Sequence, residues 1–162
     1  MGELKYLVIH CSATPAGREV TGDEIRQWHL NERGWSRVGY SDIIHLDGNI
    51  ENMVDYDEDN WISAGEITNG AVGYNGISRH VCCIGGLDEW SNELLKNGDF
   101  NDMLTPEQFT ALREYVFEFL GNHPDKQIMG HYMVNEHKNC PGFDVVKFLR
   151  FIEVPGNNIF QA

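Results

Sequence analysis

Short apolar segments that alternate with capped helical segments most constrain the fold of this chain. Residues 5–10, KYLVIH, are rich in β-branched and other apolar side chains, so they predict a buried strand. Residues 79–86, RHVCCIGG, and residues 127–130, QIMG, predict two further buried strands. Segments with helical signatures lie between them. A chain in which strands and helices take turns favours an α/β layered domain.

Capping motifs predict where the helices begin. The sequence TGDE at 21–24 is a capping box, with threonine at the N-cap and glutamate three residues later, and predicts a helix that ends at Gly34. Residues 104–123 open with a second capping box, LTPEQ, and continue with one apolar stripe, which predicts a longer helix. Asp144 is a suitable N-cap for a last short helix within 143–152.

A turn signal makes the predicted sheet mixed. Asp47-Gly48 lies between two strand-like runs within residues 42–52, and this dipeptide is the strongest short-range signal for a β-hairpin. A hairpin requires one antiparallel pair beside the parallel strands. We therefore expect one domain over residues 1–162, with a mixed sheet of about five to six strands flanked by helices.

Charge and hydropathy restrict the partners. The net charge is −13, and the 12 lysine and arginine residues are scattered, which argues against nucleic acid and against an anionic membrane surface. No apolar run approaches the ~18 residues of a membrane span. The first segment, MGELKYLVIHCSAT, is too short in its apolar part for a signal peptide. We expect synthesis and folding in the cytoplasm, without a membrane partner.

The cysteines favour free thiols. Cys82 and Cys83 are adjacent in an apolar run, where a strand would point them to opposite faces. The chain has no CxxC pair. A set of free thiols in a reducing compartment is the better interpretation than a disulfide framework.

Three residues at or beyond predicted strand ends could hold a metal. His10 ends the first strand, His131 follows the QIMG strand, and Cys140 comes soon after. Ligands of this type suit zinc, and three of them leave a fourth position open, as in catalytic sites. Cys11 is a weaker candidate because it should point away from His10. The spacing matches no standard zinc pattern, so buried, hydrogen-bonded histidines and an apolar thiol remain the alternative.

The other histidines and an acidic segment have simpler interpretations. Residues 55–66, DYDEDNWISAGE, resemble a calcium loop, but Asn60 stands where that loop needs glycine, so a solvated acidic loop is the better interpretation. The remaining histidines are placed by their elements: His29 and His45 on the surface of a helix and a hairpin, His123 and His137 in loops, and His80 on either face of its strand.

Several segments together resemble the zinc-dependent N-acetylmuramoyl-L-alanine amidases of the phage-lysozyme and peptidoglycan-recognition type. They occur in the family's order and span roughly residues 6–150. The matching segments are IHCSAT (9–14), EIRQWH (24–29), RGWSRVGY (33–40), HLDGNIE (45–51), GYN (73–75), CIGG (83–86), LTPEQ (104–108) and GH…KNCPGFD (130–144).

The resemblance implies a function and a site. It implies hydrolysis of the amide between N-acetylmuramic acid and L-alanine of peptidoglycan, as in a phage or prophage endolysin that acts on the cell wall. The family's zinc ligands fall on His10, His131 and Cys140. Its active-site tyrosine falls on Tyr40 and its catalytic lysine on Lys138. The general base stays open, because a tyrosine of pKa near 10 is a poor base at neutral pH, and Asp42 and Glu136 are reserve candidates.

The sequence also departs from the family pattern. Ser41 and Asp42 follow Tyr40 where an aromatic or His-aromatic pair is usual, and residues 67–75 lack a histidine common before the GYN-like segment. These changes leave the preferred stem peptide open. They also keep a non-catalytic peptidoglycan-binding module as the alternative, although such relatives characteristically lack the cysteine kept here as Cys140. A regulatory protein that binds a cytoplasmic enzyme is a second alternative, on which the sequence is silent.

Overall fold

A five-stranded mixed sheet forms the centre of the computed structural model, which describes residues 1–162. The strand order is β4-β3-β6-β2-β7. All neighbouring pairs are parallel except β3 and β4, which are antiparallel. The strands span β2 (Tyr6–Cys11), β3 (Asp42–Ile44), β4 (Ile50–Asn52), β6 (Ser78–Cys83) and β7 (Gln127–Gly130). A separate antiparallel pair joins β1 (Gly2–Glu3) to β5 (Trp61–Ile62). The predicted mixed α/β sheet is confirmed.

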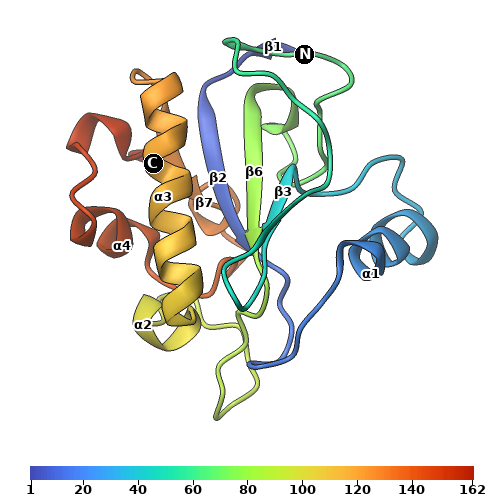
Figure 1. The fold of residues 1–162 in the computed structure, drawn as a ribbon, viewed down its shortest axis with the longest axis vertical. Coiled ribbons are helices and arrows are strands. Elements are labelled where there is room, and N and C mark those ends of the chain that lie inside the picture. Colours follow the sequence, from blue (N-terminus) through green and yellow to red (C-terminus); the bar gives the residue numbers. More distant parts are fainter.

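Helices cover both faces of the sheet (Figure 1). The helices and helical turns span α1 (Gly22–Arg26) with a π-helical continuation (Gln27–Glu32), α2 (Phe100–Met103), α3 (Pro106–Asn122), α4 (Val145–Phe151), and the 3-10 turns η2 (Asn75–Ile77), η3 (His131–Met133) and η4 (Gly156–Asn158).

Two hydrophobic cores hold the layers together. The larger core packs α3 and α4 against one face of the sheet, with Leu7, Ile9 and Val81 among its strand residues. The smaller core packs α1 against the other face and includes Ile25 and Ile43. Each face therefore buries alternate residues of the same strands. Figure 1 shows α3 and α1 on opposite sides of the strands.

Adjacent cysteines confirm this alternation. Cys82 lies in the smaller core and Cys83 in the larger one, so the two thiols point to opposite faces as predicted. All four cysteines are free and buried. Cys82 and Cys83 pack as small apolar side chains in these cores, and the chain has no framework of bridges.

Both predicted capping boxes form. Thr21 accepts a hydrogen bond from the backbone N–H of Glu24, and Thr105 accepts one from Gln108. The amide of Gln108 is itself buried, and donates to the carbonyls of Ile44 and Ile84, which ties the first turn of α3 to the sheet.

The first helix differs in form from the prediction. It does reach the segment before Gly34, but from Gln27 onward it widens into a π-helix. The backbone N–H of Arg33 donates to the carbonyl of Trp28, five residues earlier. This wider turn carries His29, which is buried rather than exposed, so the surface prediction for His29 was wrong.

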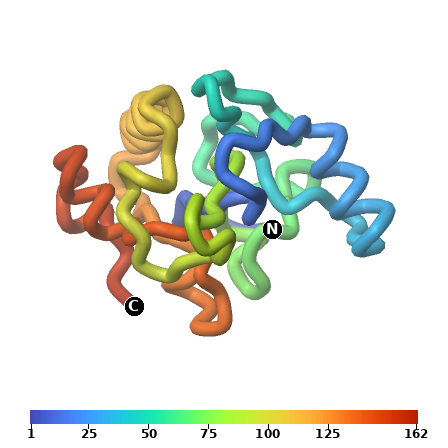
Figure 2. The backbone as a smooth tube through the Cα atoms, turned by 90° about the horizontal axis from the view of Figure 1, so that it is seen from below, coloured from blue at the N-terminus to red at the C-terminus, as the bar shows by residue number.

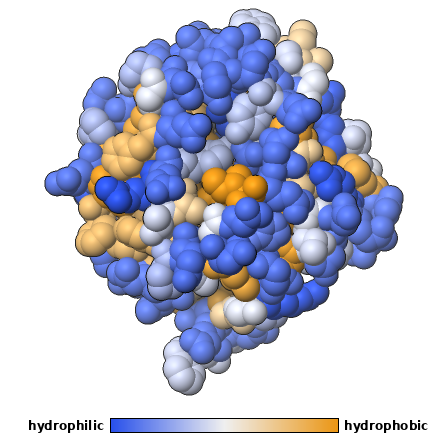
Figure 3. All heavy atoms as spheres, in the orientation of Figure 1, coloured by the Kyte–Doolittle hydropathy of each residue, from blue (hydrophilic) through white to orange (hydrophobic).

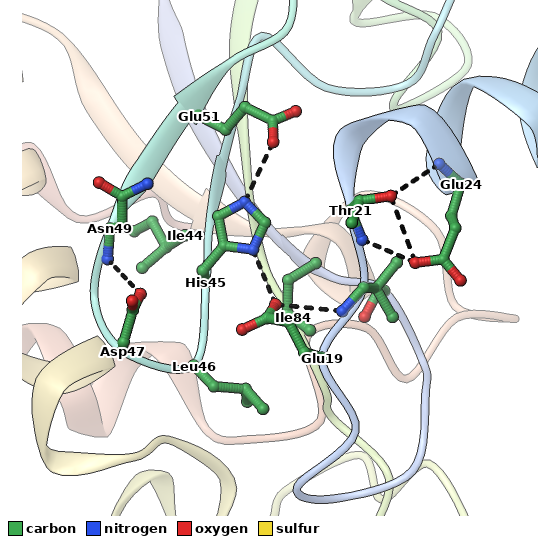
Figure 4. Close-up of polar contacts among 12 residues, drawn as sticks. Glu19, Thr21, Glu24, Ile44, His45, Leu46, Asp47, Asn49, Glu51 and Ile84 are labelled. Carbon is green, nitrogen blue, oxygen red and sulfur yellow. Dashed lines mark hydrogen bonds and ion pairs between the residues drawn. The ribbon is translucent and has the colours of Figure 1, made fainter.

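The Asp47-Gly48 hairpin joins β3 and β4 as predicted. Gly48 has φ of +85°, a left-handed conformation that favours glycine at this turn. His45 anchors the hairpin to the preceding segment, because its two ring nitrogens lie 2.7 Å from a Glu19 oxygen and 3.3 Å from a Glu51 oxygen (Figure 4). The imidazole is thus only partly exposed and bridges two carboxylates.

The acidic segment 55–66 is a loop that includes the short strand β5, and its own carboxylates hold it in place. Glu66 accepts backbone N–H groups of Asp57 and Ser63, and Asp57 accepts that of Asp59. These carboxylates bind local amides, as in Asx-type turns, rather than converging on one point. The arrangement agrees with a solvated acidic loop.

The face seen in Figure 3 is mostly hydrophilic, with small separate hydrophobic areas. None of the helices combines the length and the apolar character that crossing a membrane would require.

Candidate metal centre

Two parallel strands and one loop bring three candidate ligands together. His10 lies near the end of β2, and His131 directly follows the neighbouring strand β7. Cys140 precedes α4, and the carbonyl of Cys140 accepts a 3.0 Å hydrogen bond from the N–H of Tyr132, which holds the loop against η3. The ligand atoms of the three residues all lie within 4.8 Å of one another. Figure 2 views the molecule from this carboxyl edge of the strands.

The geometry of these atoms suits a tetrahedral metal. Nδ1 of His10 lies 3.6 Å from Sγ of Cys140. A tetrahedral zinc with bonds of ~2.05 Å to nitrogen and ~2.3 Å to sulfur requires about 3.6 Å between those two atoms. The backbone N–H of Cys11 donates to Sγ of Cys140 at 3.2 Å, and such a donor stabilises negative charge on the sulfur. Two nitrogens and one sulfur in this arrangement can hold a metal ion.

Burial keeps both imidazoles neutral. It lowers the pKa of His10 well below the usual 6.5, and nearby His80 lowers it further. The pKa of His131 falls to about 4, first because of burial and then because of the positive charge of Lys138. Burial also raises the pKa of the Cys140 thiol well above its usual range. The two histidines thus offer free lone pairs at neutral pH, whereas the thiolate needs a cation to stabilise it.

Tyr40 lies beside His10 on the face of the sheet that α1 covers. Its ring centroid is 5.3 Å from that of His10 and 5.3 Å from that of His29. Its hydroxyl donates to the carbonyl of Cys11 at 3.4 Å. Burial raises the pKa of Tyr40 well above 10, and the nearby Cys82 and Cys140 thiols add to the shift. The hydroxyl therefore stays protonated at neutral pH.

His29 supports the segment that carries Tyr40. Its Nδ1 accepts the backbone N–H of Gly39 at 3.0 Å, which requires the nitrogen to be unprotonated. Burial, followed by the charge of Arg33, lowers the pKa of His29 to about 4. The neutral ring thus holds the Gly39-Tyr40 backbone in place.

A cavity of about 190 Å³ opens onto this group. Lys138 reaches it from the loop before Cys140, and Arg33 and Trp35 line it from the segment after the π-helix. The structure thus brings the five predicted site residues to one cavity, whose lining includes His10, Tyr40, His131, Lys138 and Cys140. Its lining contains no aspartate or glutamate.

The structure places both reserve candidates for the general base outside the cavity lining. Asp42 was expected to share a face with Tyr40, but β3 begins only at Asp42, so strand alternation does not extend back to Tyr40. Oδ2 of Asp42 instead accepts hydroxyl hydrogen bonds from Tyr56 and Tyr115 at 2.5 Å each, on the face that α3 covers. Glu136 is largely exposed and lies outside the cavity lining.

The remaining histidines separate into two groups. His137 is a largely exposed loop residue, as predicted. His123 follows the end of α3, in agreement with its predicted loop position, but it is fully buried and contacts Glu58 and Asn60. His80, which the sequence left facing either way, contacts His10 and is the site neighbour that the sequence reasoning missed. The helical and strand patterns carry no signal for such a contact, because it depends on the packing of β2 against β6.

The fold and the site together define a class of protein. A mixed sheet between helices, with a His-His-Cys group at the carboxyl edge of parallel strands, is the arrangement that the sequence resemblance implied. The N-acetylmuramoyl-L-alanine amidase family model matches residues 1–143. The chain belongs to the N-acetylmuramoyl-L-alanine amidase family, and the predicted enzyme class is confirmed.

Relatives in sequence agree with this assignment. The chain is 36% identical over 148 residues to the endolysin of Enterobacteria phage K11, covering 91% of this chain and 87% of the relative. It is also 36% identical over 144 residues to the endolysin of Escherichia phage T7, covering 88% of this chain and 83% of the relative.

Solved structures with low sequence identity share the fold. The amidase LysC from Clostridium intestinale superposes with a TM-score of 0.67 at 20% identity, covering 95% of this chain and 88% of LysC. Drosophila PGRP-LB superposes with a TM-score of 0.65 at 24% identity, covering 96% of this chain and 83% of that protein. The predicted α/β architecture is therefore shared with both.

Proposed function

We propose that residues 1–162 act as one catalytic domain, a zinc-dependent hydrolase of bacterial peptidoglycan. Its substrate is the amide between the lactyl group of N-acetylmuramic acid and L-alanine. The observation that carries this proposal is the meeting of His10, His131 and Cys140 in one cavity with Lys138. Among the common metals, zinc is the one that best suits a donor set of two neutral imidazoles and a thiolate.

Zinc bound by His10, His131 and Cys140 would supply an activated water and polarise the scissile carbonyl. The chain itself must then stabilise the negative charge that develops on the carbonyl oxygen. Lys138 is the proposed source of this fixed positive charge. It lines the cavity, and it lies close enough to His131 for its charge to lower the pKa of that histidine. Such preorganised charge is the largest contribution in many hydrolases.

Tyr40 has a different proposed role, as a neutral hydrogen-bonding group. Burial favours the protonated form of its hydroxyl, so we assign Tyr40 the role of a neutral group rather than an anionic base. The oxygen can accept a hydrogen bond from the attacking water while the hydroxyl donates to the Cys11 carbonyl. Tyr40 would thus orient the water, and solvent in the open cavity would carry the proton of that water to the departing amino group of L-alanine, since no carboxylate lines the cavity.

The biological setting we propose is that of a phage or prophage endolysin. The relatives in phages K11 and T7 carry that name and match most of this chain. Such a protein is made in the cytoplasm of the host and acts on its cell wall. The alternative, a peptidoglycan-binding module without activity, is disfavoured because Cys140, Tyr40 and Lys138 all lie at the cavity.

Digestion of purified sacculi tests the proposal directly. Mass spectrometry of the products should show free stem peptides with a new L-alanine amino terminus and intact glycan strands. A zinc chelator should abolish the release, and added zinc should restore it. The Cys140→Ser variant serves as the matched control and should release no peptide. Binding to sacculi without release would support the binding module instead, and cleaved glycan would contradict the amidase assignment.

A further inference from the structure

We propose that His80 is a positioning residue that fixes the orientation and tautomer of His10 for metal binding. Its Nδ1 lies 2.9 Å from Nε2 of His10, on the side of the ring away from Cys140. The inference rests on the proposed metal site, and concerns a residue that the sequence left without a role.

The chemistry of the imidazole sets the direction of this hydrogen bond. A neutral ring carries one N–H, and the nitrogen that binds a metal must be bare. Nδ1 of His10 faces Cys140 Sγ at 3.6 Å, so it is the ligand atom. Nε2 of His10 must then carry the proton and donate a hydrogen bond to Nδ1 of His80. A partner of this kind fixes both the tautomer and the orientation of a ligand ring.

His80 is held firmly by its strand. It belongs to β6 and is fully buried. Its backbone N–H donates to Oγ of Ser41, and its carbonyl accepts the N–H of Ser41 at 2.8 Å. The ring can therefore act as a rigid acceptor for His10.

The side chain of His80 has little other reason to be polar. Its Nε2 is buried without a hydrogen-bond partner, so the contact with His10 is the single one its ring makes. Leaving a buried polar atom without a partner is unfavourable. An apolar residue would suit this position better if packing were its only task.

Gly70 provides the space for the ring. A Cβ added at Gly70 would lie 2.4 Å from Nδ1 of His80 and 2.7 Å from the carbonyl oxygen of Gly39. Any larger residue at position 70 would displace the imidazole at the atom that contacts His10. The glycine and the histidine therefore form a matched pair beside the metal centre.

Zinc affinity of two His80 variants separates positioning from packing. His80→Leu fills the space but cannot accept a hydrogen bond, whereas His80→Asn can place an amide oxygen near the position of Nδ1. Competition with a chromophoric chelator should show zinc binding that is about 10- to 100-fold weaker for His80→Leu. His80→Asn should stay within a few-fold of the wild-type chain. Thermal unfolding of the metal-free proteins checks that all variants fold.

Gly70→Ala provides a second test that leaves His80 itself intact. It should weaken zinc binding in the same direction as His80→Leu. Gly65→Ala is the matched control, because a Cβ there would meet no atom within 4 Å, and it should bind zinc like the wild-type chain.

Nitrogen-15 NMR of the zinc-loaded wild-type chain detects the hydrogen bond between His10 and His80 directly. The proton should reside on Nε2 of His10, with coupling across the hydrogen bond to Nδ1 of His80. Unchanged zinc affinity in both His80→Leu and Gly70→Ala would overturn the inference, as would a proton on Nδ1 of His10. Zinc binding with the expected variant losses but no peptide release would support the role of His80 and reject the amidase proposal.

Discussion

Lys138 is the residue whose charge the proposed chemistry needs most. Replacing it with alanine removes the fixed cation beside the scissile carbonyl but leaves the candidate ligands His10, His131 and Cys140 in place. We expect kcat on purified sacculi to fall about 100-fold or more, with zinc affinity changed only slightly. Lys147→Ala is the control, since Lys147 pairs with Asp99 away from the cavity and should leave kcat unchanged. A loss of zinc together with activity would point to a structural role for Lys138 instead.

Asp42 illustrates a residue whose importance lies in stability. Its carboxylate accepts hydrogen bonds from the hydroxyls of Tyr56 and Tyr115 and from the side-chain amide of Asn52. These hydrogen bonds link β3 to α3, to β4 and to the chain after β4. Asp42→Asn should lower the free energy of unfolding by roughly 2–3 kcal/mol, because bonds to a charged acceptor are the stronger kind. Urea unfolding measures this, and activity at low temperature should persist. Asp55→Asn, at an exposed position, is the control and should change neither the free energy of unfolding nor the activity. If the Asp42→Asn protein folded but lost activity, Asp42 would again be a candidate for the general base.

Single residues also show why the site was only partly readable from sequence. His10, His131 and Cys140 follow from strand ends and a family pattern, so their positions could be predicted. The contacts of His29, His80 and Asp42 depend on which strands and helices pack against one another. Alternation and spacing along the chain do not indicate which elements become neighbours.

Among the elements, the hairpin β3–β4 offers a pH-dependent anchor through His45. Partial burial alone would lower the pKa of His45, but the carboxylates of Glu19 and Glu51 outweigh it and raise the pKa above 6.5. A raised folded pKa means that the stabilisation is fully present below the unfolded value and is lost as pH rises through the folded value.

Replacing His45 with glutamine should therefore destabilise the chain most at acidic pH. The difference in free energy of unfolding between wild type and His45→Gln should be largest below the usual pKa of 6.5 and should shrink as pH rises through the raised pKa of His45, where the imidazole loses its charge. Urea unfolding in the presence of a chelator, at several pH values, measures this difference. A difference that grows with pH would contradict the bridging role seen in Figure 4.

Elements with strong local signals were the ones that sequence could predict. The capping boxes at Thr21 and Thr105 and the turn at Gly48 are satisfied by residues a few positions apart, so tertiary packing did not change them. The π-helix from Gln27 to Glu32 is different. Its wider turn carries buried His29, which bonds to Gly39, a distant contact that helical propensity does not encode.

At the scale of the whole molecule, the net charge of the chain and the charge of the cavity lining have opposite signs. The chain carries a net charge of −13, whereas the cavity is lined by the cations Arg33 and Lys138 and by no carboxylate. An anionic substrate would thus be repelled at long range and attracted only close to the site. The cavity lies at the carboxyl edge of the strands, and its lining holds none of the 25 aspartate and glutamate residues of the chain.

This arrangement predicts an unusual salt dependence on the proposed substrate, whose stem peptides carry carboxylates. The screening length falls from ~30 Å at 0.01 M salt to ~8 Å at 0.15 M, so added salt removes the long-range repulsion before it affects contacts inside the cavity. We expect kcat/KM on sacculi to rise several-fold over this range. A small soluble muropeptide with amidated carboxylates is the control, and should show little change. If kcat/KM on sacculi instead fell steadily with salt, attraction by Arg33 and Lys138 would dominate the encounter, and the acidic surface would have no part in it.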